Sequence, residues 1–367
     1  MSEQNKLEVC DRYNQEDCHG LGLFEKLLPV WIAMCIVIGI LLAQFVPVLS
    51  ETINSLQVGG ISVPIGACLF LMMYPAMLNL QASEFKKLGR NPKPIILTII
   101  SNWIVAPLVG VAVAVLFLGN HPDLILAVIL LSSSPCTAMV LVWGWMAKGN
   151  QEQNVVNTSL NTITIIFLYI PVVYLLVSIA NITLEQKIPL DPLMLLISLV
   201  IFIGLPLALG IISKKYLVKS KGETWFEDKY RPFLSKIAIL ALLTTLIILF
   251  ALNGKSLIEN PDLLILISIP LLIGFAIVVG YNIIITKLTK LKYREAIITV
   301  IIGSSSHFEI AIAVAVAMRG VGSIAALGTT MGLFWEVPIM LALVYLGRYL
   351  GRRKFWEGYD EAITNFK

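Results

Sequence analysis

Long apolar runs alternate with short polar connections along almost the whole chain. Ten of these runs reach about 20 residues, the length that an α-helix needs to cross the hydrocarbon core of a bilayer. The pattern therefore predicts an all-α polytopic membrane protein. A single membrane domain is expected over residues 24–351, between a polar N-terminal tail (1–23) and a C-terminal tail (352–367). The predicted spans are approximately Leu27–Val48, Val63–Leu80, Ile95–Leu118, Asp123–Ala147, Val155–Ala180, Leu193–Ser213, Phe233–Leu252, Leu263–Thr286, Arg294–Met318 and Ser323–Leu346.

The composition agrees with a membrane protein. Hydrophobic residues make up 57% of the chain and charged residues only 14%, whereas a soluble domain is about a quarter charged. Mean hydropathy is +0.86. The formal net charge of +4 is small for 367 residues, so it gives no indication of a nucleic-acid partner. The lipid bilayer is the expected environment.

The lysines and arginines predict how the chain is oriented. If the N-terminus is inside, 24 of the 27 basic residues fall in inside segments, and only Lys187, Lys255 and Arg319 fall outside. Positive charge accumulates on the cytoplasmic side of membrane proteins. We therefore expect a multi-pass protein of the cell (plasma) membrane with both termini in the cytoplasm.

The second half of the chain repeats features of the first half in the same order. The separations of the matching positions are 163, 172 and 167 residues. Each half, about residues 27–180 and 193–346, holds five predicted spans. An odd number of spans means that the second copy enters the membrane from the opposite face, which gives an inverted repeat and suits alternating access. The matching positions are Pro107 and Pro270, the triplets Ser132–Ser134 and Ser304–Ser306, and Pro171 and Pro338.

The two serine triplets predict interruptions in the fourth and ninth spans. In the fourth span Pro135 follows the triplet directly; proline removes a backbone donor and disfavours the helical conformation of the residue before it. Irregular backbone at membrane depth is tolerated only where it faces protein or a water-filled cavity. Two broken helices in matching positions of the two halves therefore indicate a substrate site.

Three ionisable residues lie away from the predicted span ends: His307, Glu309 and Glu336. Such groups are costly in a membrane and usually functional. Burial favours the protonated carboxyl group, so Glu309 is a candidate proton carrier; the alternative is a carboxylate held by amides of the broken helix. His307 either shares that proton or caps exposed backbone. Glu336, two residues before Pro338, is expected to hold freed backbone groups, with direct substrate contact as the alternative.

Cys136 lies at the predicted break of the fourth span. Thiolates select soft metal and metalloid centres, and a single soft ligand binds cargo reversibly, as a carrier requires. The other cysteines are expected to pack in apolar spans (Cys35, Cys68) or to lie in the N-terminal tail (Cys10, Cys18), where with His19 they meet no zinc spacing. We therefore expect no metal site and no cofactor.

Five segments match motifs of one known family: Pro135–Trp143 (PCTAMVLVW), Phe308–Ala315 (FEIAIAVA), Met72–Pro75, Asn102–Trp103 and Glu336–Pro338. Over about residues 23–351 the chain resembles the arsenite efflux permeases of the arsenical-resistance-3 family. The resemblance implies the ten-helix fold of the bile/arsenite/riboflavin transporter superfamily. In that fold a panel domain (first, second, sixth and seventh spans) supports a core domain whose broken fourth and ninth helices cross at the midplane.

The resemblance also implies export of arsenite, and in some members antimonite, driven by the proton gradient. By this likeness Cys136 and Glu309 match the essential thiol and carboxylate of the family. Further matching positions are Trp143, Asn161, Phe308 and Glu336. The chain has Pro135 where one branch has arginine, and His307 where asparagine is common.

The favoured hypothesis is therefore a secondary transporter that exports arsenite by proton antiport, with Glu309 and His307 as proton-coupling groups. The alternative is a sodium-coupled symporter of organic anions on the same fold, whose ion sites need several oxygen ligands. An enzyme is not expected, because no span carries paired aspartates or a HExxH zinc motif. The predicted substrate-binding residues are Ser133, Ser134, Cys136, Trp143, Asn161, Phe308 and Glu309, and the predicted supporting residues are Asn102, Pro135, Ser305, Ser306 and Glu336.

Overall fold

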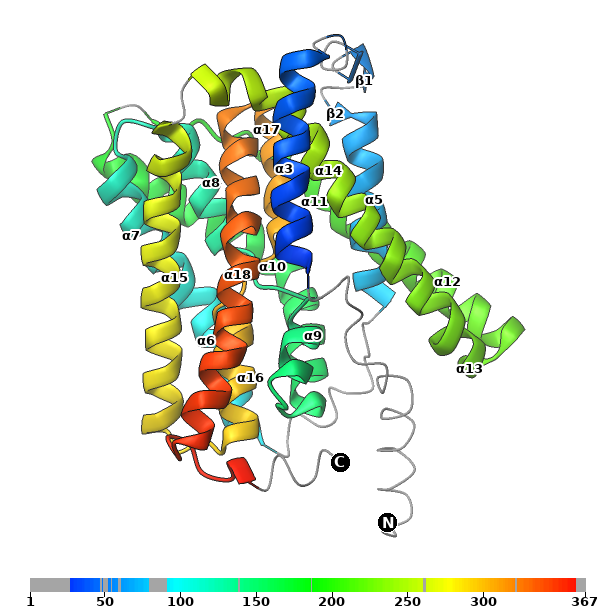
Figure 1. Cartoon of the computed structure of the whole chain (residues 1–367), viewed down its shortest axis with the longest axis vertical. Coiled ribbons are helices and arrows are strands. Elements are labelled where there is room, and N and C mark those ends of the chain that lie inside the picture. Colours follow the sequence, from blue (N-terminus) through cyan, green and yellow to red (C-terminus); the bar gives the residue numbers. More distant parts are fainter. Residues whose placement is uncertain are drawn as a thin grey trace.

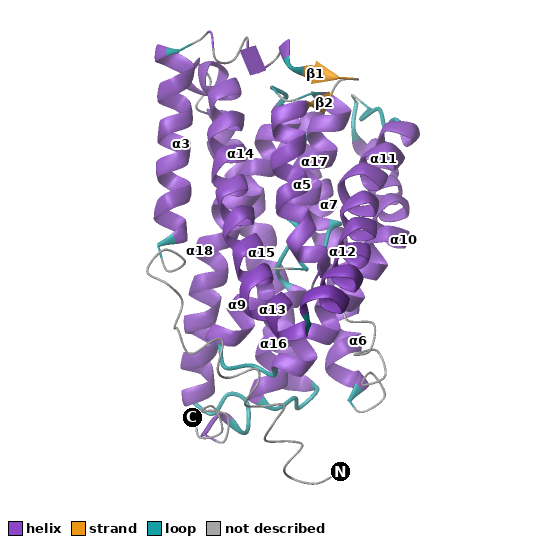
Figure 2. Cartoon of the chain, turned by 90° about the vertical axis from the view of Figure 1, so that its right-hand side faces the viewer, coloured by secondary structure: helices purple, strands orange, loops and turns teal. Residues whose placement is uncertain are grey.

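The computed structural model describes residues 27–360 apart from 47, 49–51, 54, 59–60, 79–90, 138, 186, 260–261 and 321. The predicted N-terminal tail with Cys10, Cys18 and His19, and residues 361–367 of the C-terminal tail, lie outside the described residues. The described chain is almost entirely helical (Figure 2). One small antiparallel pair of strands, Gln57–Val58 (β1) and Ile61–Ser62 (β2), precedes the second predicted span.

The helices follow the predicted spans closely. With the labels of Figure 1, they are α3 (Leu28–Phe45), α5 (Val63–Leu78), α6 (Pro92–Ile100), α7 (Ala106–Leu118), α8 (Pro122–Ser132), α9 (Met139–Met146), α10 (Gln151–Thr183), α11 (Pro192–Leu199), α12 (Leu205–Lys221), α13 (Glu223–Trp225), α14 (Arg231–Glu259), α15 (Asp262–Leu288), α16 (Tyr293–Gly303), α17 (Phe308–Arg319) and α18 (Ile324–Arg352). In the described part of the chain, consecutive helices are joined without a break by three π-helical turns: Ser101–Val105 (η2), Val200–Gly204 (η3) and Phe226–Tyr230 (η4).

Within the described residues, six continuous helices are long and apolar enough to cross a membrane. Many large apolar side chains on them are exposed, such as Phe167 at 69% and Ile265 at 62%, which suits contact with lipid. The prediction of an all-helical polytopic membrane protein is confirmed. The six helices are Pro92–Leu118, Gln151–Thr183, Pro192–Lys221, Glu223–Leu252, Asp262–Leu288 and Ile324–Arg352; shorter apolar helices are Val30–Phe45, Val63–Pro75 and Pro122–Ser132.

The predicted spans leave a longer basic connection around Lys214–Lys236. In the structure this connection is helical on both sides of a turn at Gly222, whose φ is +87°. Apolar residues recur there at helical spacing and pack together, with Phe226 and Leu234 buried against Leu78 of α5. The basic segment is therefore a helical hairpin, and its charged residues do not interrupt the helices.

The helices form two groups (Figure 1). In the first group α14 packs along α3 and α5, and α12 packs on α5. In the second group α7 and α15 pack together, and α8 packs on α7 and α18. The interrupted helices α8/α9 and α16/α17 belong to the second group, and α17 also contacts α5 and α11 of the first group.

The turns after α9, α15 and α18 meet at one end of the molecule, which we call the basic end after Lys148, Lys290 and Lys354. Tyr293 connects these turns: its hydroxyl donates to the Ala147 carbonyl oxygen at 2.7 Å, and its amide donates to the Glu357 carbonyl oxygen at 2.8 Å. This end therefore fixes the positions from which α10 and α16 run toward the interruptions.

Candidate functional site

The fourth predicted span is interrupted where the serine triplet and Pro135 occur. Helix α8 ends at Ser132 and α9 begins at Met139. The hydroxyl of Ser133 donates to the Ile129 carbonyl oxygen at 2.7 Å, and that of Ser134 donates to the Leu130 carbonyl oxygen at 3.1 Å. Serine hydroxyls that bond back to the preceding turn occupy the carbonyl groups left by the ending helix.

The ninth predicted span is interrupted in the same way, and the two interruptions contact one another. Helix α16 ends at Gly303 and α17 begins at Phe308. The two segments pair antiparallel at Pro135 and Ser306. The Cys136 amide donates to the Ser305 carbonyl oxygen at 3.4 Å, and the His307 amide donates to the Ser134 carbonyl oxygen at 2.6 Å. The two predicted breaks are therefore real, and backbone hydrogen bonds hold them together.

Glu336 supports the second interruption from α18. One of its carboxylate oxygens, Oε1, accepts hydrogen bonds from the Ser305 hydroxyl at 2.5 Å and the Ser306 amide at 3.0 Å. The other oxygen, Oε2, accepts from the Ser306 hydroxyl at 2.5 Å. These contacts agree with the interpretation of Glu336 as a holder of freed backbone groups.

Asn161 of α10 supports the first interruption in a similar manner. Its side-chain amide donates to the Cys136 carbonyl oxygen at 3.0 Å, and its Oδ1 accepts from the Asn102 side chain at 3.2 Å. Asn102 lies in the π-helical turn η2, and π-helical turns are frequent at functional sites. Both asparagines are buried. Each interruption is thus held by a polar side chain of the long helix that follows it.

His307 and Glu309 are close to one another at the start of α17. His307 Nε2 lies 3.5 Å from Glu309 Oε2 and 3.4 Å from the Thr137 hydroxyl. The His307 side chain does not cap α17. The His307 ring therefore lies between Glu309 and Thr137 in this structure.

The other predicted site residues are buried around the interruptions. Cys136 is 2% exposed and Glu309 is 7% exposed, so neither side chain is turned outward to lipid. Phe308 is buried at the first position of α17, and Trp143 is buried in α9 within the apolar core.

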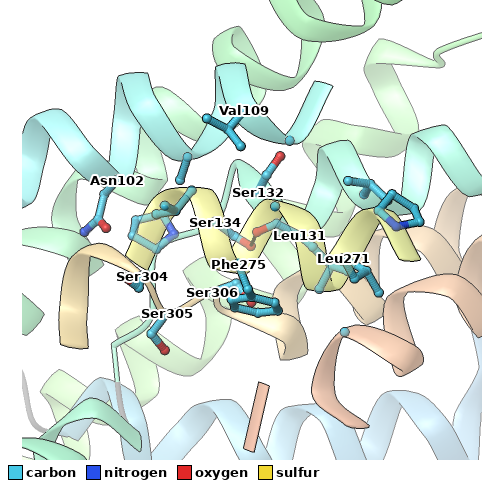
Figure 3. Close-up of a pocket in the computed structure, with 18 residues that line it drawn as sticks. Asn102, Val109, Leu131, Ser132, Ser134, Leu271, Phe275, Ser304, Ser305 and Ser306 are labelled. Carbon is cyan, nitrogen blue, oxygen red and sulfur yellow. Dashed lines mark hydrogen bonds between the residues drawn. The ribbon is translucent and has the colours of Figure 1, made fainter. Parts of the chain in front are cut away.

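A cavity of about 70 Å³ lies beside the paired interruptions (Figure 3). Its polar lining comes from both serine triplets and Asn102, and its apolar lining from α7, α8 and α15, including Phe275. Among the predicted residues it is lined by Asn102, Ser134, Pro135, Ser305 and Ser306. It is not lined by Ser133, Cys136, Trp143, Asn161, His307, Phe308, Glu309 or Glu336.

Two residues that shape this region, Gly110 and Asn282, were not among the predicted site residues. An ideal Cβ atom at Gly110 would overlap the hydroxyl of Ser132, so glycine allows α7 to approach α8. Asn282 of α15 donates to the Ser101 hydroxyl at 2.8 Å and to the Ser304 hydroxyl at 3.2 Å. Asn282 could have been found in the sequence as a polar residue within an apolar span. Nothing in the sequence indicated the close approach of α7 and α8 at Gly110.

Comparisons with known proteins show the family to which the chain belongs. The Sodium Bile acid symporter family matches residues 67–260, which is more than half of the chain and includes the first interruption. The chain belongs to this family. Members of the sodium bile acid symporter family are transporters, and this chain, with its long apolar helices, is a transmembrane transporter.

Relatives of this family member include arsenical-resistance proteins. It is 34% identical to "Arsenical-resistance protein Acr3" of Alkaliphilus metalliredigens, over 92% of this chain and 95% of that protein. It is 30% identical to the Acr3 protein of Corynebacterium glutamicum, over 91% of each chain. It is also 39% identical to "Uncharacterized transporter slr0944" of Synechocystis sp., over 92% of this chain and 90% of that protein. The likeness to the arsenical-resistance family is therefore confirmed along nearly the whole chain.

Proposed function

We propose that this transporter exports arsenite, and antimonite as a further substrate, from the cytoplasm by proton antiport. The observation that carries the proposal is the pairing of the two interruptions. This pairing brings the backbone of Cys136 onto Ser305, four residues before Glu309. A soft ligand and an ionisable carboxyl group thus lie at one crossing of broken helices. The likeness to Acr3 proteins supports arsenite as the cargo.

Arsenous acid is a small neutral molecule with three hydroxyl groups and a soft arsenic atom. In the proposed complex the Cys136 thiol replaces one hydroxyl group of arsenous acid: a sulfur–arsenic bond forms, one arsenic–oxygen bond breaks, and the thiol proton leaves with that hydroxyl group as water. Attack of water on the arsenic reverses the step and releases the cargo. The hydroxyl hydrogens of Ser133 and Ser134 are directed to carbonyl groups of α8. Their oxygen lone pairs can therefore accept hydrogen bonds from the cargo. Asn161 positions the Cys136 backbone, while Phe308 and Trp143 enclose the site.

The proton in this scheme belongs to Glu309, with His307 as its neighbour at 3.5 Å. A carboxyl group couples a proton gradient to transport only if its protonation differs between the outward-facing and inward-facing states. Glu309 lies on α17, which contacts α5 and α11. If the second helix group moves past these two helices, the surroundings of Glu309 change, and its protonation can then differ between the two states. Glu336 is bound to Ser305 and Ser306 and supports the break instead of carrying the proton.

The proposed architecture is ten membrane spans in two inverted five-span repeats, with both termini in the cytoplasm of a cell-membrane protein. Two interruptions of equal kind, 172 residues apart and paired antiparallel, support the repeat. The lysines of the basic end support its assignment to the cytoplasm. No enzymatic activity is proposed.

A second candidate function is sodium-coupled uptake of an organic anion. The family name refers to such a symporter, and the serine and amide oxygens around the interruptions are suitable sodium ligands. In this case the Cys136 sulfur would have no role in binding.

The decisive experiment measures arsenite flux into inverted membrane vesicles with an imposed pH gradient. We expect uptake by the native chain, none by Cys136→Ala, and uptake without its pH dependence by Glu309→Gln. Cys35→Ala is the matched control, because Cys35 is a buried cysteine of α3 far from the interruptions in the sequence. Sodium-dependent transport of a carboxylate that is unaffected by Cys136→Ala would favour the second candidate.

A further inference from the structure

A regular row of polar contacts joins α6 and α10 between the basic end and the first interruption. On α6 and η2 the row uses Pro94, Thr98 and Asn102, and on α10 it uses Gln153, Asn157 and Asn161. Both sets are spaced by four residues, so each lies on one face of its helix. Thr299 of α16 completes the row. We call these seven residues the polar ladder.

The ladder has three successive levels. At the first level the Gln153 side-chain amide donates to the Thr299 hydroxyl at 3.1 Å, and Thr299 donates to the Pro94 carbonyl oxygen at 3.3 Å. At the second level Asn157 donates to the Thr98 hydroxyl at 3.3 Å. The third level is the contact between Asn102 and Asn161 at 3.2 Å.

The two ends of the ladder connect different parts of the molecule. At the basic end Gln153 also donates to the Glu295 carbonyl oxygen at 3.3 Å, and the Glu295 carboxylate accepts from exposed Asn91 at 2.7 Å. At the other end Asn161 donates to the Cys136 carbonyl oxygen at 3.0 Å. The ladder therefore leads from the surface to the first interruption.

Contacts between helices do not account for all polar atoms of the ladder. Gln153 Oε1 and Asn157 Oδ1 are fully buried and accept no hydrogen bond from the described part of the chain. Their residues are 6% and 1% exposed. A buried acceptor without a donor costs free energy. If the ladder only joined α6 to α10, we would therefore expect a hydrogen-bond donor beside each of these two oxygens.

The two unpaired oxygens belong to one small region. The amide groups of Gln153 and Asn157 are each bonded to a threonine hydroxyl, of Thr299 and Thr98 respectively. Both of these hydroxyls donate to the same Pro94 carbonyl oxygen, at 3.3 Å and 2.9 Å. Several acceptors thus gather around one carbonyl group, an arrangement that suits buried water, which typically makes about three hydrogen bonds to such groups.

We propose that the polar ladder is a hydrated column that brings water from the basic end to the backbone of Cys136. The water molecules donate to Gln153 Oε1 and Asn157 Oδ1. The column is separate from the cavity beside the interruptions, because only Asn102 belongs to both. It provides solvent to the first interruption from one side of the membrane, whatever the cargo is.

The test compares cysteines at two adjacent positions, Thr299→Cys and Ile298→Cys. Both residues are 0% exposed and lie at the same depth, but Ile298 packs in the apolar core and Thr299 belongs to the ladder. Inverted vesicles with the full chain are treated with a small charged methanethiosulfonate reagent. Mass spectrometry then reads modification of the peptide that contains both positions. The native cysteines at 10, 18, 35, 68 and 136 lie outside this peptide.

We expect Thr299→Cys to react at least about tenfold faster than Ile298→Cys, because the reacting thiolate forms where water solvates it. Equal rates would overturn the proposal. Threonine and cysteine are nearly equal in size, so the variant is expected to fold. Asn157→Cys tests the opposite side of the ladder and should also react faster than Ile298→Cys. Since the readout is labelling, a dry ladder and an incorrect substrate assignment give different results.

Discussion

At the scale of single residues, the interruptions depend on a few polar groups that replace helical hydrogen bonds. The Glu336 carboxylate receives three hydrogen bonds from Ser305 and Ser306, and Asn161 holds the Cys136 carbonyl oxygen. A broken helix within an apolar core leaves donors and acceptors that cost free energy if unpaired. These two side chains should therefore matter for stability as well as for transport.

We predict that Glu336→Ala lowers the stability of the folded protein by about 1–3 kcal/mol, because it leaves buried donors of Ser305 and Ser306 unpaired. The measurement is thermal unfolding of the purified chain in detergent. Glu336→Gln retains a carbonyl oxygen that can accept two of the three bonds, and it should lie between the native chain and Glu336→Ala. If both variants unfold at the same temperature as the native chain, Glu336 does not stabilise the interruption.

A second residue-scale prediction concerns the thiol. Cys136→Ser should weaken arsenite binding by at least about tenfold, which corresponds to ~1.4 kcal/mol, because a hydroxyl group is a harder ligand than a thiolate. Titration of the purified chain with arsenite gives the affinity. Cys35→Ser, at another buried cysteine, should bind as the native chain does. If Cys136→Ser and the native chain bind arsenite with equal affinity, the Cys136 sulfur does not bind the arsenic.

At the scale of elements, close helix packing sets the shape of the region around the interruptions. Gly110 brings α7 against Ser132, and Gly303 brings α16 against Ser101. The π-helical turn η2 places Ser101 and Asn102 beside the interruptions, with Pro107 at the second position of α7. Small residues are common where membrane helices approach each other closely.

Gly110→Ala is therefore expected to force α7 and α8 apart. The added methyl group overlaps the Ser132 side chain, and such overpacking typically costs about 1–3 kcal/mol. Gly274→Ala is the matched control, since Gly274 of α15 lines the same cavity and a Cβ atom there meets nothing within 4 Å. Thermal unfolding and transport are measured for both. Equal behaviour of the two variants would contradict the close approach.

At the scale of the whole molecule, Arg319 joins α17 and α8 of the second helix group to the segment before α11 of the first group, at the end opposite the basic end. Arg319, the last residue of α17, lies 3.1 Å from Asp123 of α8 and donates to the Pro189 carbonyl oxygen at 2.9 Å. Pro189 belongs to the segment before α11. Motion of one helix group past the other would break the hydrogen bond from Arg319 to the Pro189 carbonyl oxygen.

Arg319→Gln should favour the state in which this end is open. We expect faster labelling of a cysteine introduced at Ile188, which is 2% exposed in this structure. The loss of folding stability should be small, because a partly exposed ion pair contributes about 0–1 kcal/mol. Lys187→Gln removes an exposed charge of the same segment and should leave the labelling rate unchanged. Unchanged labelling in Arg319→Gln would show that the contact does not restrain this end.

Much of the fold and part of the site could be predicted from local sequence. Apolar runs gave the helices, and Pro135 with its serines gave the first interruption, because helix geometry and backbone hydrogen bonding are local. The hairpin at Lys214–Lys236 was missed because its charges concealed a helical apolar spacing that matters only when Leu78 packs against it. The polar ladder was also missed, since its meaning depends on which helices are neighbours.

The sequence by itself determined that this chain is a helical membrane protein, where its helices break and which thiol and carboxyl groups lie at the breaks. Only the tertiary structure decided that the breaks pair through Ser134 and Ser305, that Glu336 holds one and Asn161 the other, and that the cavity is lined by serines and not by Cys136. The reason is physical. A helix or its interruption follows from residues within a few positions of one another, whereas the pairing and support of the breaks join residues from 25 to 173 positions apart, which meet only after the chain has folded.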